Sequence, residues 1–189
     1  MTSSPPRMPP LPDDKLSAEQ RKAIADIVSG PRGSLVGPFI PLLRSPEFMN
    51  RLQRTGEYLR FNSAFETRLS ELAILLTARA WSQNFEWHHH RPIGEKAGLR
   101  ASIVDAIAEG RRPDGMAMDE ATIYDFIDEL VRNRTVSEPT YQRTVSMFGE
   151  KGVIDLIGIH GYYSLLAMVL NVTHAPLPEG SKPGLAPLP

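Results

Sequence analysis

The sequence predicts an all-helical protein with one folded domain and an extended segment at each end. Hydrophobic residues recur at helical spacing through most of the chain, and helix-capping patterns precede several of these stretches. No stretch shows the alternating hydrophobic and polar residues of a strand bounded by turns. The chain has 189 residues, which suits one domain and is long enough to bury a core.

The composition restricts the class of protein. Hydrophobic residues make up 41% of the chain and charged residues 23%, and the formal net charge is −1. Because this balance is neither strongly basic nor that of a disordered chain, we expect no nucleic-acid partner. The chain has no cysteine, which excludes disulfides, thiolate metal ligands and thiol redox chemistry.

Proline-rich segments flank the predicted domain, which covers residues 16–173. Residues 1–15 lack the apolar core of a signal peptide, so we expect a flexible lead and a cytoplasmic protein. The tail over residues 174–189 is too rich in proline to form a helix. We interpret this tail either as a flexible end or as an arm laid over a neighbouring subunit.

Capping patterns place the first three helices. Ser17-Ala-Glu-Gln20 is a capping box that opens a short helix, and Gly30 can close it. A helix over residues 46–60 begins with an N-cap serine, a proline and an acid. Ser63-Ala-Phe-Glu66 is a second capping box and predicts a helix over residues 64–81.

The segment between the first two helices, residues 30–41, holds too much glycine and proline for a helix. We expect it to form an ordered loop that can line a pocket.

The second half continues the helical pattern after Ser82-Gln83-Asn84, which interrupts the apolar residues with residues that favour caps and turns. A helix should run from about residue 83 to residue 96, and Pro92 should kink or shorten it. Asp119 can cap one of the later helices. These later helices are expected over residues 100–109, 120–133, 138–148 and 152–173.

The last predicted helix is apolar on nearly every face and has the length of a bilayer span. It contains Asp155 and His160, and a central aspartate costs roughly 2.5–3.5 kcal/mol on membrane insertion. We therefore expect a buried helix and no membrane partner. Gly158 and Gly161 allow close backbone approach, so this helix is either the centre of the bundle or a seam between subunits of a homo-oligomer.

Polar residues on either side of the interruption predict a functional site. Gln83, Glu86 and His90 are related as i, i+3 and i+7, so they share one helical face and can converge on a small molecule. In an antiparallel helix pair, Glu71 would lie level with about residue 93, near His90. Two carboxylates and an imidazole in apolar surroundings can exchange protons near neutral pH, which predicts acid–base chemistry.

The N-terminus of the same helix presents free N–H groups, which attract an anionic substrate or a developing enolate. We therefore expect a small, anionic substrate.

Other interpretations of these residues remain open. Glu71 can instead form an ion pair with Arg68 or Arg79. Glu86 and His90 at i, i+4 can share a divalent metal ion, although consecutive histidines on a helix point about 100° apart and cannot all bind one ion.

The remaining histidines and tyrosines have structural interpretations. We expect His88 and His89 to be solvated or interfacial, and His160 to be a hydrogen-bonded core residue. Tyr162 and Tyr163 pack in the core, or one hydroxyl faces the pocket.

Several of these motifs resemble one protein family. The sequence E-L-A-I-L, followed by W-S-Q-N-F-E-W-H-H-H and Gly98-Leu99, is similar to the carboxymuconolactone decarboxylase family, whose relatives include the alkylhydroperoxidase D-like proteins. The earlier G-P-F-I-P-L-L-R-S-P-E-F and the later G-Y-Y-S-L-L-A-M-V-L-N also resemble this family. The similarity covers roughly residues 35–172.

The resemblance implies an alkylhydroperoxidase D-like bundle of about seven helices that forms homo-oligomers. Its peroxidase branch uses a glutamate, a Cys-x-x-Cys pair and a histidine, which fall here on Glu71, on Gln83 and Glu86, and on His90. Because thiolate attack on peroxide needs a cysteine, we expect no thiol peroxidase activity. The decarboxylase-like branch often has E-W and a following histidine, as Glu86-Trp87 and His90 have.

In the decarboxylase interpretation, the enzyme stabilises and protonates an enolate-like carbanion without a cofactor or a metal. The catalytic residues are His90 as proton donor, Glu86 as its orienting partner or the alternate acid, and Glu71 as a carboxylate behind them.

The expected substrate-binding residues are Gln83 and Trp87 as pocket walls and Arg79, or else Arg91, as the partner of a substrate carboxylate. Trp87 also has the interpretation of a core residue.

Three functions remain open from the sequence. The first is a cofactor-free decarboxylase, or a related lyase or isomerase, acting on a small carboxylated lactone or aromatic-derived compound. The second is a family member that binds a small molecule without converting it. The third is a metal-dependent enzyme that uses Glu86 and His90.

Overall fold

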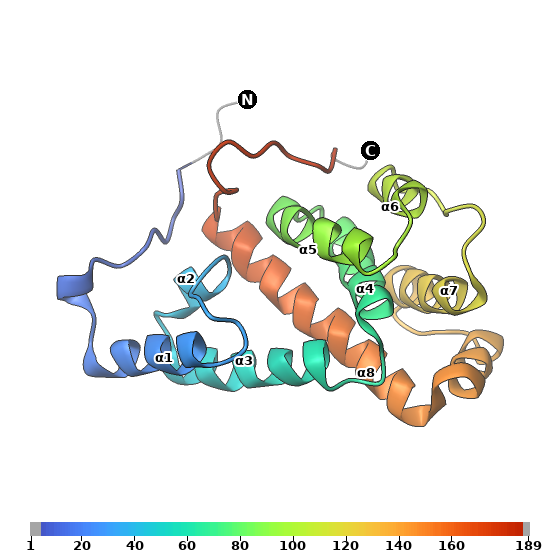
Figure 1. The fold of residues 1–189 in the computed structure, drawn as a ribbon, viewed down its shortest axis with the longest axis horizontal. Helices are drawn as coiled ribbons and strands as arrows, with labels where there is room; N and C mark the ends of the chain where they lie inside the picture. The colour runs from blue at the N-terminus through green and yellow to red at the C-terminus, as the bar shows by residue number, and fades with distance from the viewer. Residues whose placement is uncertain (1–4, 187–189) are drawn as a thin grey trace.

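The fold is all-helical, as the sequence predicts. Over residues 5–186, the range that the structure describes, the computed structural model contains eight α-helices, one short 3-10 helix and no strand (Figure 1). In chain order these are η1 (Asp13–Lys15), α1 (Ala18–Ser29), α2 (Phe39–Leu42), α3 (Pro46–Phe61), α4 (Thr67–Ala80), α5 (Asn84–Lys96), α6 (Ala101–Ala108), α7 (Met118–Asn133) and α8 (Glu138–Thr173).

Helix α4 is the centre of the bundle. Every residue from Leu69 to Arg79 is buried, because α3, α5, α6, α7 and α8 all pack against this helix. Its apolar residues occupy successive turns on every side, as a surrounded helix requires. Helix α4 is therefore the element that fixes where the other helices lie.

Helix α5 returns along α4 as an antiparallel partner. The turn between them is tied by a hydrogen bond from the N–H of Gln83 to the carbonyl of Ala78, at 2.8 Å. Further along, a Cβ atom built on Gly94 would lie 3.4 Å from the Cβ of Glu71, so the two backbones approach closely at this level. Glu71 thus lies level with Gly94, one residue from the predicted position.

The helix boundaries agree with the sequence at the first capping box and differ at the second. At Ser17, both hydrogen bonds of the capping box to Gln20 are present. Helix α4 begins at Thr67 rather than at residue 64, and Glu66 is its N-cap. The N–H of Ala64 instead donates to Asp155 on α8, at 2.8 Å, which holds residues 62–66 outside the helix.

The predicted loop over residues 30–41 ends in the short helix α2, so the loop is shorter than expected. Pro38 precedes this helix, where a missing N–H costs no intrahelical hydrogen bond.

Helix α5 continues through Pro92 to Lys96 and is not shortened. Proline deprives the carbonyl of His88 of its helical partner, but His88 is exposed to solvent, which can replace the lost bond.

Helix α7 starts at Met118, two residues before its predicted start, with Ala117 as N-cap. The Glu120 carboxylate accepts a hydrogen bond from the N–H of Ala117 at 2.8 Å, so an acid in the first turn takes the capping role predicted for Asp119. Arg68 on α4 binds both acids, at 2.6 Å from Asp119 and 2.8 Å from Glu120. This pairing anchors α7 to α4.

Helix α8 combines the two last predicted helices, and the chain bends where they meet (Figure 1). Gly149 has φ 71° and ψ 173°, a backbone conformation that is essentially restricted to glycine. By length and composition alone, α8 could cross a membrane. Half of its most apolar 18-residue stretch is buried inside the protein, as is usual for the core helix of a folded domain.

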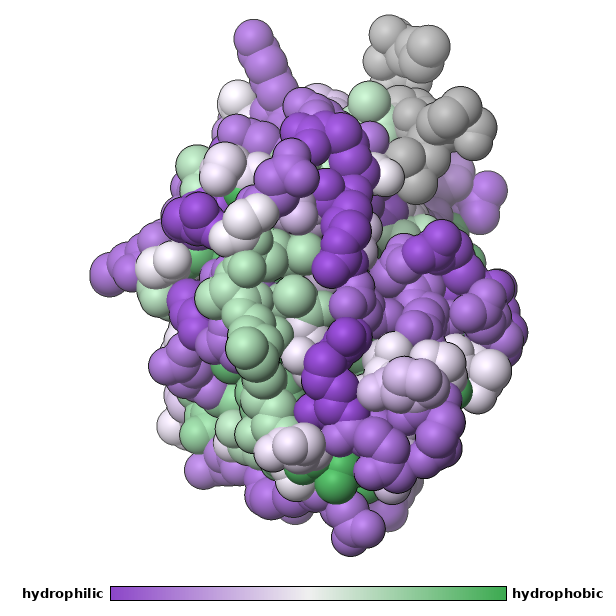
Figure 2. Space-filling model, turned by 90° about the vertical axis from the view of Figure 1, so that its right-hand side faces the viewer, coloured by the Kyte–Doolittle hydropathy of each residue, from purple (hydrophilic) through white to green (hydrophobic). Residues whose placement is uncertain are grey.

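The outer side of α8 leaves four large apolar side chains exposed: Ile154, Ile157, Met168 and Val172. The side of the molecule that carries α6 and α7 is mainly hydrophilic, with one strip of moderately hydrophobic surface (Figure 2). Homo-oligomer formation stays a prediction.

Both proline-rich segments lie against helices of the same chain over the described residues. Arg7 binds the carbonyls of Thr173 and Val172 at the end of α8. Leu185 is buried, and its N–H donates to Asn84 at 2.9 Å. Residues 174–186 therefore cover the start of α5 in their own chain, whereas the sequence led us to expect a flexible end or an arm over a neighbour. The remaining parts of both predicted segments, residues 1–4 and 187–189, lie outside the described range.

We predict that Gly149→Ala lowers the free energy of unfolding by about 1–3 kcal/mol, since alanine is strained in this conformation. The matched control is Gly161→Ala in the same helix, where space is open and the backbone is helical. That change should raise stability by up to about 1 kcal/mol. Urea denaturation of both variants checks the prediction, and equal stability of Gly149→Ala and the wild type would contradict it.

Candidate active site

Two carboxylates hold the ring of His90 from opposite sides. His90 Nδ1 lies 2.6 Å from Glu71 Oε2, and His90 Nε2 lies 3.3 Å from Glu86 Oε2. Glu71 belongs to α4, whereas Glu86 and His90 lie one turn apart on α5. The three residues that the sequence assigns to catalysis are thus brought together.

All three side chains are removed from solvent, with exposed fractions of 3–4%. The other carboxylate oxygen of Glu86, Oε1, is buried and has no hydrogen-bond partner among the described residues. A buried acceptor without a partner is costly, and in native proteins it often marks a functional group. Glu86 Oε1 can therefore accept from, or when protonated donate to, a molecule bound beside it.

The pKa of His90 is raised above its ordinary value of 6.5. Burial alone would lower it, but the charge and hydrogen bond of Glu71, together with those of Glu86, outweigh burial. His90 can therefore carry an ionisable proton near neutral pH, as a general acid requires.

Aromatic side chains complete the surroundings of His90. The ring of Tyr163 on α8 meets His90 edge to face, with 5.0 Å between ring centres. Its hydroxyl has a pKa raised well above 10, by burial first of all, so it stays protonated. The ring of Phe85 lies parallel to that of His89 and packs against the backbone of Gly37, where no side chain would fit.

A small cavity of about 40 Å³ opens beside this group. His90 and Glu86 line it, whereas Glu71 does not and lies behind His90. The other walls come from the loop before α2, from α2, α3 and α5, and from α8: Arg32, Val36, Pro38, Phe39, Arg60, Phe85, His89, Tyr163 and Leu166. The loop over residues 30–38 thus lines a pocket, as the sequence predicts.

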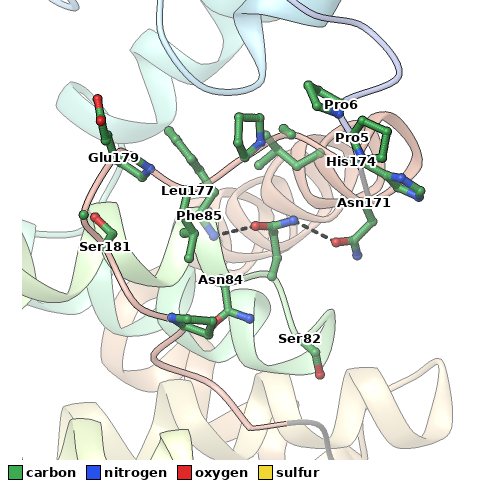
Figure 3. Close-up of a pocket in the computed structure, with 17 residues that line it drawn as sticks. Pro5, Pro6, Ser82, Asn84, Phe85, Asn171, His174, Leu177, Glu179 and Ser181 are labelled. Carbon is green, nitrogen blue, oxygen red and sulfur yellow. Dashed lines mark hydrogen bonds between the residues drawn. The ribbon is translucent and has the colours of Figure 1, made fainter. Parts of the chain in front are cut away.

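The residues predicted to bind substrate lie outside this cavity. Gln83 is the N-cap of α5: its Oε1 accepts from the N–H of Phe85 at 2.6 Å, and its Nε2 donates to Asn171 at 2.7 Å, as the dashed lines in Figure 3 mark. Trp87 is 1% exposed and packs against Gly184. It is therefore a core residue, the second of the two interpretations that the sequence allows.

Arg79 also points elsewhere. Its guanidinium donates to the carbonyls of Ala108 and Ala186, at 3.2 Å and 2.8 Å, so it joins the C-terminal segment to α4. Arg91 pairs with Glu95 and Asp105 on the outside of the bundle. Neither arginine is positioned to hold a carboxylate beside His90.

Gln83 faces a larger pocket of about 720 Å³ between the start of α5 and the C-terminal segment (Figure 3). Asn171, His174 and Glu179 are among the polar residues on its walls. None of the three residues assigned to catalysis lines this pocket, so we place the candidate active site in the smaller cavity.

The other interpretations left open by the sequence can now be placed. Arg68 binds acids at the start of α7, so Glu71 pairs with His90 and with neither of the two arginines considered for it. His160 Nδ1 lies 3.0 Å from the hydroxyl of Thr77, so the expected hydrogen bond is present, but His160 is half-buried rather than a core residue. Across residues 5–186, no three side chains of aspartate, glutamate or histidine have the arrangement of a metal site.

Three residues that line the cavity, Arg32, Arg60 and Phe85, were not predicted from the sequence. Arg32 and Arg60 line the cavity but come from the loop before α2 and from α3, far from Glu86 in the sequence. Phe85 lies directly before Glu86 in the sequence but is not among the predicted site residues. The one available signal was the expectation that residues 30–41 line a pocket.

This arrangement of helices is that of the alkylhydroperoxidase AhpD core. A solved structure described as an AhpD core, from an uncharacterized peroxidase-related protein of Ralstonia eutropha JMP134, matches with a TM-score of 0.73 and 16% identity, over 93% of this chain and 94% of that chain. A protein of unknown function from Agrobacterium tumefaciens, associated by name with the antioxidant defence protein AhpD, matches with a TM-score of 0.61 and 14% identity, over 72% and 94%.

Identities this low show the shared fold alone. No protein-family model and no curated protein matches the chain. The fold is therefore AhpD-like, and the chemistry must be argued from the side chains of the site.

We predict that Glu71→Gln lowers the pKa of His90, because the burial that opposes its charge would remain while its closest anionic partner is lost. A titration of the His90 ring by NMR measures this. Glu95→Gln, which removes a carboxylate from a more exposed position on α5, is the control and should leave the pKa of His90 nearly unchanged. Equal effects of the two substitutions would contradict the assignment.

The same group makes stability depend on pH. Because the pKa of His90 is raised in the folded protein, its stabilising effect is fully present below about pH 6.5 and is lost as the pH rises through the folded value. The free energy of unfolding should fall over that range in the wild type and fall less in Glu71→Gln. Denaturant titrations at a series of pH values test this.

Proposed function

We propose that the protein is a cofactor-free lyase that decarboxylates a small carboxylated compound by acid–base chemistry. The observation that carries the proposal is the placement of His90 between two carboxylates, one of which has an unpartnered oxygen beside a cavity. This arrangement supplies a proton donor and a means of restoring its proton inside a water-poor site.

The reaction needs a substrate whose carboxylate is attached to a carbon conjugated with a carbonyl. When the carbon–carbon bond breaks, its electron pair moves into the carbonyl, and carbon dioxide leaves. The resulting enolate must be protonated on carbon, and His90 Nε2 is the nitrogen on the side of Glu86, which itself lines the cavity. Product release and reprotonation of His90 complete the cycle.

Glu71 and Glu86 have different roles in this scheme. Glu71 is a positioning residue: its carboxylate accepts a hydrogen bond from Nδ1–H, which fixes the orientation of the ring and favours the imidazolium. Glu86 faces the cavity and can relay a proton to His90 through Oε2, or act as the alternate acid through Oε1. The shorter distance from His90 to Glu71 than to Glu86 supports giving the orienting role to Glu71.

The resemblance of E-L-A-I-L and F-E-W-H-H-H to the carboxymuconolactone decarboxylase family supports this choice of chemistry. The AhpD-like fold is compatible with it. A thiol peroxidase would need cysteines, and Gln83 and Glu86 stand at the positions of the peroxidase pair. A carboxylated lactone or an aromatic-derived acid is the substrate class that this resemblance favours.

We predict that His90→Asn and Glu86→Gln each lower turnover by about 100-fold or more, since general acid catalysis contributes roughly 10²–10⁴-fold. A mass-spectrometric turnover screen across carboxylated lactones and aromatic acids identifies the substrate and then measures the variants. His88→Asn is the matched control, because His88 is exposed and contacts Ser181 rather than the cavity. Retained turnover in both site variants would exclude the proposed chemistry.

A further inference from the structure

We propose that Arg60 and Arg32 form an anion subsite in the cavity beside His90, and that this subsite binds the carboxylate of a monoanionic substrate. The inference rests on the proposed function for the location of the reaction, and it assigns substrate recognition to two residues that the sequence did not single out. It also replaces Arg79 and Arg91, whose guanidinium groups are bound elsewhere.

Arg60 is a cation with no assigned partner. It lies near the end of α3 and lines the cavity together with Glu86 and His90. Among residues 5–186 its half-buried side chain has no hydrogen-bond or ion-pair partner, and its guanidinium carbon lies 5.3 Å from the ring centre of Phe61. By contrast, Arg51 on the same helix pairs with Glu47. The donors of Arg60 are therefore available to a bound anion.

Arg32 is held in place by contacts that leave part of its guanidinium unused. Its Nη2 donates to the hydroxyl of Tyr162 at 3.1 Å, and its guanidinium carbon lies 4.7 Å from the ring centre of Phe39. Its Nε is buried and has no partner among the described residues. Gly56 on α3 makes this placement possible, because a Cβ there would lie 2.5 Å from the guanidinium.

The charges around the cavity leave room for one anion. Arg32, Arg60 and the imidazolium of His90 carry three positive charges, and the carboxylates of Glu71 and Glu86 carry two negative ones. His89 adds no charge near neutral pH, because its pKa is lowered by desolvation and by the charges of His90 and Arg60. A net positive charge beside the cavity favours a monoanion over a neutral molecule or a dianion.

The size of the cavity agrees with the carboxylate end of this substrate. A volume of 40 Å³ can hold about three water molecules, which is close to the size of a carboxylate and its attached carbon. A guanidinium binds such a planar group through two parallel hydrogen bonds. As carbon dioxide leaves, the negative charge moves to the enolate oxygen, so the same cations can neutralise the anion before and after the bond breaks.

Acetate and its neutral isostere acetamide test the subsite directly, by ligand-observed NMR on the wild-type protein. Acetate should bind more tightly than acetamide, and Arg60→Gln should weaken acetate binding by about 10-fold without changing acetamide binding. Arg32→Gln should weaken acetate binding in the same direction, and Arg60→Lys should restore part of the loss. Arg54→Gln removes an exposed charge from the same helix and should have no effect.

Circular dichroism melts of each variant separate a loss of binding from a loss of folding, and Arg60→Lys provides the comparison if Arg60→Gln melts early. Equal acetate binding in Arg60→Gln and Arg54→Gln, or no acetate binding by the folded wild type, would overturn the proposal. Acetate binding that depends on Arg60, without turnover of any acid in the screen, would retain the subsite and reject the lyase. Turnover that is unaffected by Arg60→Gln would retain the lyase and reject the subsite.

Discussion

The burial of His90 with its two carboxylates is the constraint on which the rest of the site depends. Charged groups removed from water are stable only when their partners are close and well oriented. The 2.6 Å contact between His90 and Glu71 meets this requirement and joins α5 to α4 at one fixed level. Gly94 permits the close approach, and the surrounding helices exclude water. A packing requirement and a chemical requirement are therefore met by the same contact.

Much of this arrangement could be predicted from the sequence, because it depends on contacts between neighbouring helices. The antiparallel pair and its rise per residue placed Glu71 beside His90, and helical spacing placed Glu86 one turn before it. Gln83 has the same helical spacing from His90, but its side chain does not point toward the cavity. As the N-cap of α5 it turns back to bind the N–H of Phe85, and helical periodicity does not describe a residue in an extended conformation.

The cations of the cavity could not be predicted in the same way. Arg60 and Arg32 reach it from α3 and from the loop before α2, and their position beside His90 depends on how α2 and α3 pack against α8. Periodicity within one helix carries no information about such contacts. The predicted start of α4 was wrong for a related reason: a tertiary hydrogen bond from Ala64 to Asp155 overrides the local capping pattern.

The bend at Gly149 has a consequence for how this fold tolerates changes in length. In an uninterrupted helix, one inserted residue rotates everything beyond it by about 100° and would turn Tyr163 and Leu166 away from the cavity. The non-helical backbone at Gly149 breaks that rotational coupling between the two parts of α8. An insertion or deletion between residues 138 and 148 should therefore leave the part of α8 beside His90 in the orientation set by its own packing.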